Sequence, residues 1–250
     1  MLKRMRDALK QQDYVFLGLE VIVVIFSLLV AFELDRWAED RREQKQEQTY
    51  LVWLKEDLQI EIDQLDDATE YAQDRIAAAL LLEKIASDPA VAIDNPGALA
   101  KALETASWRS FPSLNAFVYS ELQNSGKLAL IRSDKLRRVL AEHYASFHDS
   151  SRVGLDRDVQ RQFDRHTAGI LTSEELRNIE EGSWQGIPVV VSAGRAAEIA
   201  KQLVSRPEAV DLIPSIVQHH VFNIKAIEQT RNSAVDLIEQ IDQLLAGPTG

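Results

Sequence analysis

The side chains with the widest catalytic use are the five histidines, and their spacing matches no metal-binding or catalytic pattern. His143 and His148 are five positions apart and share a helix face poorly, while the adjacent His219 and His220 point in different directions on a helix. The sequence also lacks the H-E-x-x-H, G-x-S-x-G and G-x-G-x-x-G patterns and a Walker phosphate loop. We therefore expect no catalytic residue, no metal and no cofactor. We predict that the protein is not an enzyme and that His143 is a core or boundary residue with satisfied hydrogen bonds.

A run of acidic residues is the most unusual polar feature. Eight acids and no base lie between residues 56 and 74. Such a run can bind a cationic partner, a basic peptide or a divalent ion, or it can be a solvated helix face that keeps the protein soluble. Both interpretations stay open. The candidate interaction face comprises Glu56, Asp63, Asp66, Asp67, Glu70 and Asp74.

The composition excludes several classes of function. The chain has 250 residues with 28 basic and 39 acidic side chains, which gives a net charge of −11. A nucleic-acid partner is not expected, because phosphate binding needs a basic face. The absence of cysteine excludes disulfides, thiolate metal sites and a cysteine nucleophile.

The first element that the sequence predicts is an apolar segment over residues 15–34. Twenty helical residues span roughly 30 Å, the thickness of the hydrocarbon core of a bilayer. The aromatic residues Tyr14 and Trp37 flank the segment and are expected to act as interfacial anchors. We predict a transmembrane helix in a lipid bilayer. A cleaved signal peptide is the alternative, but Leu29 and Ala31 make a poor cleavage site.

A carboxylate inside this segment suggests a contact with another helix. Glu20 shares one helix face with Val24, Ser27 and Ala31. Small residues let helices approach, and a carboxyl group in lipid favours a partner. We therefore expect this face to bind a membrane-protein partner or a second copy in a homo-oligomer. The alternative is a protonated glutamate that lipid tolerates.

The rest of the chain is expected to be all-α. No proline or glycine occurs between Glu33 and Ser87, where apolar residues at spacings of three, four and seven form one stripe. A second long helix is expected over residues 215–246. We predict that the transmembrane helix continues into a long helix, which packs with the long C-terminal helix and several shorter helices as a bundle. The expected divisions are a basic N-terminal arm (1–14), the transmembrane helix (15–34), one α-helical soluble domain (35–246) and a flexible tail (247–250).

Local signals predict where the shorter elements begin and end. Thr172 and Glu175 have the spacing of a capping box, and Gly182 is a plausible stop for the helix that follows. Ser205 begins a second pattern of the capping-box form. Residues 186–191 are the one strand-like run, which we interpret as an extended strap over the core.

Two stretches of the sequence have the form of family motifs. The first stretch runs from EVIVVIFSLLVAF at Glu20 through Trp37-Ala-Glu39 to YLVWLKEDL at Tyr50. The second runs from Tyr119 to Ile131 and continues through Leu136 to Tyr144. Together they resemble an uncharacterised family of bacterial single-pass membrane proteins with an all-α soluble domain. The sequence departs from the family at Asp35-Arg36 and at Ala38, where asparagines are usual. The resemblance implies a membrane location and a fold, and it implies no activity.

The orientation in the membrane follows from the flanking charges. Four lysines and arginines precede the segment and four follow it, so their count is a tie. The N-terminal arm is short and basic, whereas the later bases are interleaved with acids. We therefore predict a bacterial inner-membrane protein with a cytoplasmic N-terminus and a periplasmic C-terminal domain.

These observations predict a membrane-anchored helical interaction or scaffold domain, as an accessory subunit of a membrane assembly. The alternative is a helical bundle at the outer face of the inner membrane that senses a small molecule. A bundle pocket that gathers aromatic side chains would favour this alternative. The candidates are Trp108, Phe111, Tyr119, Tyr144 and Trp184.

Overall fold

The computed structural model describes the backbone of residues 2–108, 112, 116–147, 150–185 and 187–247. It describes their side chains except those of 2–18, 146–147, 150–157 and 183–185. Every regular element in these ranges is a helix, which confirms the all-α prediction. The first helix, α1 (Leu2–Ser87), has 86 residues and is therefore about 130 Å long. It includes the stretch predicted as an N-terminal arm.

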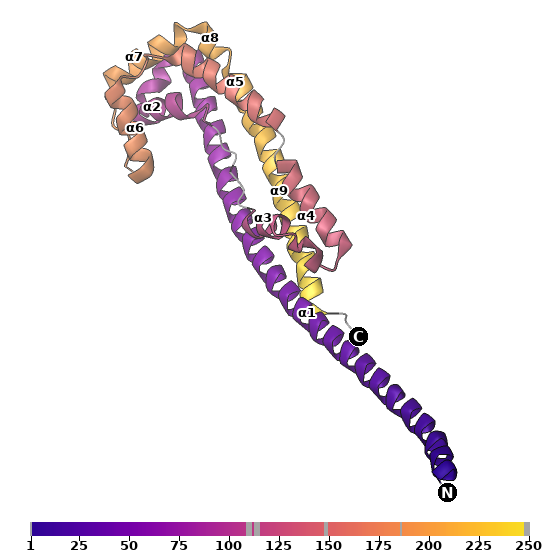
Figure 1. The fold of residues 1–250 in the computed structure, drawn as a ribbon. Coiled ribbons are helices and arrows are strands. Elements are labelled where there is room, and N and C mark those ends of the chain that lie inside the picture. Colours follow the sequence, from indigo (N-terminus) through magenta and orange to yellow (C-terminus); the bar gives the residue numbers. More distant parts are fainter. Residues whose placement is uncertain (1, 109–111, 113–115, 148–149, 186, 248–250) are drawn as a thin grey trace.

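The last helix, α9 (Ile213–Ala246), runs antiparallel to α1 and lies along it (Figure 1). Its proline, Pro214, lies in the first turn, where the missing N–H would have no helical partner. The apolar stripes of the two helices face each other, with Leu54 and Leu58 of α1 and Leu237 and Ile241 of α9 fully buried. The predicted pairing of the two long helices is confirmed.

Shorter helices cover this pair at two levels, and each level has its own apolar core. Near the middle of α1, helices α3 (Phe117–Asn124), η2 (Lys127–Leu130) and α4 (Asp134–Phe147) enclose one cluster. At the far end of α1 (Figure 1), a second cluster is enclosed by the remaining elements. These are η1 (Pro89–Ile93), α2 (Pro96–Thr105), α5 (Ser150–Thr167), α6 (Ser173–Gln185), α7 (Ala193–Val204) and α8 (Pro207–Val210).

The predicted helix boundaries hold in part. The capping box forms, because the N–H of Thr172 donates to Glu175 and the N–H of Glu175 donates to the Thr172 hydroxyl. Gly182 does not end this helix, which continues to Gln185. A Cβ atom added to Gly182 would lie 2.7 Å from the carbonyl oxygen of Ile187, so the glycine permits a close backbone approach instead of a helix stop. The pattern at Ser205 does not form a cap, since its hydroxyl donates back to Gln202 of the preceding helix.

The strap prediction is confirmed for the described residues 187–191, which have no regular structure. Val189 and Val191 pack against the far core cluster. The strap passes so close to the start of α2 that a Cβ atom added to Gly97 would lie 2.1 Å from the carbonyl oxygen of Val189. This close approach explains the glycine at that position.

The prediction of a transmembrane helix over residues 15–34 needs correction. No helix in the described part of the chain is long and apolar enough to cross a membrane. Glu20 and Glu33 enclose an uncharged run of α1 that covers only residues 21–32. Twelve helical residues are about 18 Å long, whereas a hydrocarbon core is about 30 Å thick.

Candidate functional site

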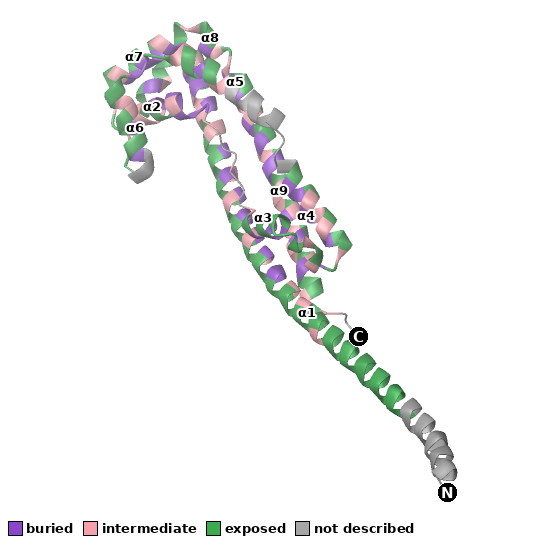
Figure 2. Ribbon diagram, in the orientation of Figure 1, coloured by how far each residue is buried: buried purple, intermediate pink, exposed green. Residues whose placement is uncertain are grey.

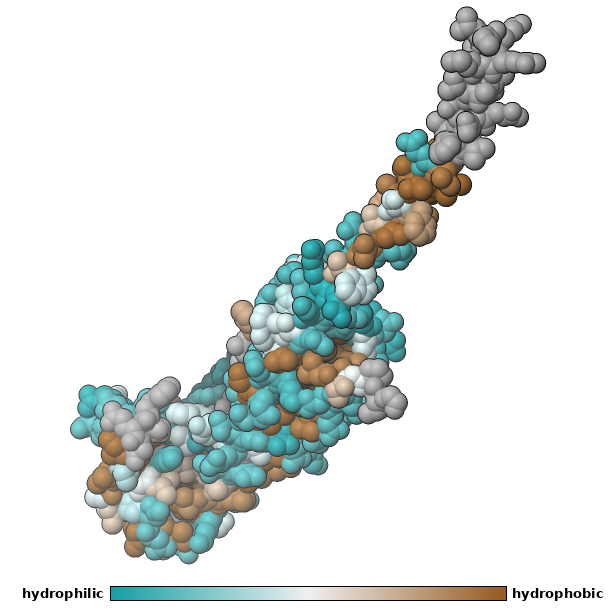
Figure 3. All heavy atoms as spheres, turned by 90° about the horizontal axis from the view of Figure 1, so that it is seen from below, coloured by the Kyte–Doolittle hydropathy of each residue, from teal (hydrophilic) through white to brown (hydrophobic). Residues whose placement is uncertain are grey.

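The most conspicuous surface is the apolar section of α1, which we define as residues 19–34. It projects beyond the body of the molecule, where Figure 2 shows it as exposed and Figure 3 shows it as hydrophobic. Its twelve large apolar side chains are 41–67% exposed. They are Leu19, Val21, Ile22, Val23, Val24, Ile25, Phe26, Leu28, Leu29, Val30, Phe32 and Leu34. In the described chain, the first buried residue of α1 is Tyr50, so the apolar section is not part of the core.

The predicted helix-contact face lies on this section. Glu20, Val24, Ser27 and Ala31 are all exposed, and among the described elements none covers them. The hydroxyl of Ser27 donates to the carbonyl of Val23 at 2.7 Å, which satisfies it within the helix. Association through this face stays a prediction.

The two predicted interfacial anchors differ in what the structure describes. The side chain of Tyr14 lies outside the described residues. Trp37 is 58% exposed, and the guanidinium carbon of Arg41 lies 4.9 Å from its ring centroid. This cation–π pair presents an aromatic and a cationic group together, one turn beyond the apolar section.

The acidic run divides into an inner and an outer set. Asp57 accepts a hydrogen bond from the backbone N–H of Val118 at 2.8 Å, and Glu61 is buried. Asp66 forms an ion pair with Arg231 of α9 at 2.6 Å. The other members of the predicted interaction face are exposed along one line of α1, since they are spaced 7, 11, 14 and 18 positions from the first. They are Glu56, Asp63, Asp67, Glu70 and Asp74.

A buried polar group links three helices in the core beside α4. The Nε2 atom of His143 lies 2.7 Å from Glu61, and its Nδ1 atom lies 2.9 Å from the hydroxyl of Ser233. The side chains of His143 and Glu61 are each only 1% exposed. A neutral imidazole can donate to the Glu61 carboxylate from Nε2 and accept the Ser233 hydroxyl at Nδ1. The expectation that His143 is a satisfied core residue is confirmed.

Ser233, His143 and Glu61 are bonded in the same sequence of hydroxyl, imidazole and carboxylate as a nucleophilic triad. However, His143 and Glu61 are buried between packed helices. Glu61 belongs to the acidic run, but its spacing places it on the buried face of α1. It is seven positions after Leu54 and four before Leu65, both of which are fully buried. The helical period therefore contains the signal that this carboxylate points inward.

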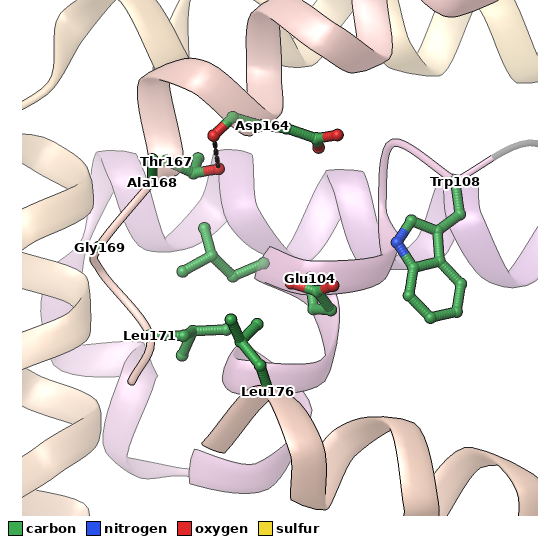
Figure 4. Close-up of a pocket in the computed structure, with 9 residues that line it drawn as sticks. Glu104, Trp108, Asp164, Thr167, Ala168, Gly169, Leu171 and Leu176 are labelled. Carbon is green, nitrogen blue, oxygen red and sulfur yellow. Dashed lines mark hydrogen bonds between the residues drawn. The ribbon is translucent and has the colours of Figure 1, made fainter. Parts of the chain in front are cut away.

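A cavity of about 260 Å³ lies in the far part of the body, between α2, α5 and α6 (Figure 4). Glu104 of α2, Asp164 of α5 and Trp108 line it together with Leu171 and Leu176. Burial raises the pKa of both carboxyl groups, and their mutual repulsion raises the pKa of Glu104 further. The hydroxyl of Ser107 donates to Asp164 at 3.0 Å. Both acids can therefore hold protons at a higher pH than usual.

The aromatic residues proposed for a ligand pocket do not form one in the described structure. Tyr119 and Tyr144 stack on each other with ring centroids 4.7 Å apart, inside the core cluster beside α4. Burial and the nearby carboxylates of Glu61 and Asp57 raise the pKa of Tyr144. Trp108 lies in the other half of the body, with Arg75 5.4 Å from its ring centroid.

The other two aromatic candidates, Phe111 and Trp184, lie outside the described side chains. Among the residues that are described, no three or more histidines and carboxylates are grouped so that they could hold a metal ion.

Comparison with known proteins identifies a family and no individual relative. No curated protein and no solved structure matches the chain. Residues 20–153 match the model of a family of unknown function, DUF6090, which confirms the resemblance to an uncharacterised family. The match includes the apolar section, both stretches quoted for that resemblance, Glu61 and His143. Because it covers more than half of the chain, the protein belongs to the family of unknown function DUF6090.

Proposed function

We propose that this protein is a helical interaction protein that attaches to a lipid bilayer through the apolar section of α1 and holds its body at the surface as a scaffold. The observation that carries the proposal is the exposure of twelve large apolar side chains on a section of α1 that no other described element covers. Exposed apolar surface of this size, next to a polar body, is typical of a membrane or protein contact.

The distribution of these side chains favours lipid over a single protein partner. The six consecutive residues 21–26 are all large, apolar and 51–67% exposed. Six residues exceed one helical turn, so every side of the helix is apolar. A partner helix covers one stripe, whereas hydrocarbon chains cover all sides, and helices that are apolar all round occur in cores or in lipid.

The free energy available from this contact is large. Complete burial of a Val, Leu, Ile or Phe side chain contributes about 1.5–3 kcal/mol, so a half-exposed one contributes about 1 kcal/mol. Twelve such side chains supply on the order of 10 kcal/mol. Part of this gain offsets the loss of translational and rotational freedom on binding.

Charged residues at both ends of the section suit the headgroup layer. Glu20 and Glu33 bracket the uncharged run, and Trp37 with Arg41 follows at the body side. Carboxylates stay hydrated there, and an aromatic ring beside a cation favours the same layer.

Vesicle flotation tests the attachment. The full-length protein should float with phosphatidylcholine vesicles, and Ile25→Asp should weaken its partitioning by more than 100-fold. The substitution removes about 1 kcal/mol of apolar burial and adds a carboxylate that costs at least about 2 kcal/mol to bury. The matched control is Val190→Asp, on the strap, where the residue is 93% exposed and binding should not change. Equal flotation of wild type and Ile25→Asp would contradict the proposal.

The scaffold role also predicts that two copies meet through the face that contains Glu20 and Ala31. The chain has no cysteine, so a single introduced cysteine reports contacts cleanly. Ala31→Cys should form a disulfide dimer on vesicles, because small residues allow close approach. Leu29→Cys, on the opposite side of the helix, is the control. A dimer yield that is equal at both positions, or absent at both, would rule out this face.

A further inference from the structure

We propose that Lys45 and Lys127, together with Tyr50 and Trp53, bind a phosphate group that belongs to a molecule with an apolar part. These residues line a pocket of about 240 Å³ where α1 enters the body, on the side of the apolar section. Gln46 and Thr49 complete its lining. Neither lysine is used by the fold for an ion pair within the described residues. The site is independent of the attachment through the apolar section, but a lipid source for the phosphate rests on that proposed function.

The pocket combines side chains from two elements. Lys45, Tyr50 and Trp53 come from α1, and Lys127 is the first residue of η2. Gly126, just before it, has a positive φ of 70°, a left-handed conformation that glycine adopts without strain. This turn brings Lys127 to α1, where its ammonium group donates to the Tyr50 hydroxyl at 3.2 Å.

The Lys127 ammonium group also lies 5.8 Å from the centroid of the Tyr50 ring. One of its three N–H groups is used in the bond to the hydroxyl, so two can donate to a ligand. The hydroxyl of Tyr50 donates in turn to Glu121 at 3.4 Å. Lys127 is therefore held in place by contacts that leave donors for an anion.

The carboxylates nearest to the pocket along α1 are occupied by another cation. Arg132 forms ion pairs with Glu43 at 3.9 Å and with Glu47 at 3.6 Å. The backbone N–H of Arg132 also donates to Glu47 at 2.7 Å. With these acids engaged, the lining of the pocket has two positive charges and no negative one, although the whole chain carries −11. A site with two ammonium groups favours a multiply charged anion such as phosphate.

The aromatic wall indicates that the ligand also has an apolar part. Tyr50 is buried and packs edge-to-face on Trp53 with ring centroids 5.5 Å apart. Trp53 keeps 44% of its surface exposed, so a ligand can cover it. A bare inorganic ion would leave this surface in water, whereas an aryl or lipid phosphate would bury it.

Two sources of such a phosphate fit the position of the pocket. Lys45 follows the end of the apolar section by eleven residues, or about 16 Å along α1, and helical side chains lean toward the N-terminus. The pocket therefore faces the side of the body from which a membrane lipid would come. A free phosphomonoester is the other source.

Calorimetric titration of the full-length protein with phenyl phosphate tests the site. Wild type should bind, and the variant Lys45→Gln with Lys127→Gln should bind at least tenfold more weakly, because two charge-assisted hydrogen bonds are lost. The control replaces Lys84 and Lys225, which are exposed and remote, by glutamine and so has the same net charge. Inorganic phosphate should bind more weakly than phenyl phosphate, because it cannot cover Trp53.

Flotation distinguishes the two sources and separates this site from the attachment. With phosphatidylcholine vesicles, the Lys45→Gln and Lys127→Gln variant should float like wild type. Addition of phosphatidic acid should increase wild-type binding only if the source is lipid, and the double variant should lose that increase. The proposal is overturned if wild type binds neither phenyl phosphate nor phosphatidic acid, or if the double variant binds as well as wild type to whichever of the two wild type binds.

Discussion

Replacement of His143 should destabilise the fold far more than replacement of an exposed residue on the same helices. His143→Leu leaves the Glu61 carboxylate without its partner at 2.7 Å, in a position where 1% of the side chain is exposed. The Oε2 atom of Glu61 already has no hydrogen-bond partner in the described structure, so no other group compensates. Loss of one partner from a buried pair costs about 3–5 kcal/mol in free energy of unfolding.

The pair is best measured as a double-mutant cycle. Glu61→Leu alone should also destabilise the fold, because it removes the partner of the buried Nε2 atom of His143. The variant with leucine at both positions should lose less than the sum of the single losses, by about 2 kcal/mol or more, since two apolar groups replace two polar ones.

Urea unfolding followed by far-UV circular dichroism gives these free energies. Glu70→Leu is the control, since Glu70 is exposed on α1, and we expect it to change the free energy of unfolding by about 0.5 kcal/mol or less. A loss below about 1 kcal/mol for His143→Leu, or additive losses in the double variant, would refute the assignment of His143 and Glu61 as a coupled buried pair.

Two further predictions concern the far end of the body. Gly97→Ala should lower the free energy of unfolding by about 1–3 kcal/mol, because the new methyl group meets the backbone of Val189. The control Gly194→Ala has open space at its Cβ position and should be neutral or stabilising in the same urea assay. Arg195 donates to Glu175 at 2.7 Å and lowers the pKa of that carboxyl group to about 2. The stabilisation of the fold by this pair is therefore complete above the usual pKa near 4.5 and is lost as the pH falls toward 2. Wild type should therefore exceed Glu175→Gln in urea midpoint at pH 6 and lose this advantage progressively in acid; a constant difference down to the lowest pH would show that the ion pair is not its cause.

The helical period and the turn residues determine most of the secondary structure. The stripe of α1, the antiparallel partner α9 and the capping box at Thr172 all follow from local spacing, and the structure contains all three. The predictions at Gly182 and Ser205 are wrong because other contacts override the local signals. Gly182 has no positive φ and lies against the backbone of Ile187, and the Ser205 hydroxyl donates backward to Gln202 rather than forward.

The candidate sites could be predicted only in part, because they depend on residues that are distant in sequence. The apolar section and the exposed acidic line are visible from composition and period alone. The pocket with Lys45 joins residues 82 positions apart, and the cavity with Glu104 joins residues 60 apart. The spacing of residues in the sequence does not predict such contacts, because they depend on how the short helices pack across the long ones.

The sequence by itself therefore determined that the protein is all-α, with two long helices, an apolar section near one end and a net negative charge. Those features follow from local propensity, from the period of 3.6 residues and from a sum of charges. Only the tertiary structure decided which acids are buried, paired or exposed, and which lysines remain without a carboxylate. A charged side chain acquires its role from the groups that surround it, and those groups come from elements brought together by the burial of apolar surface.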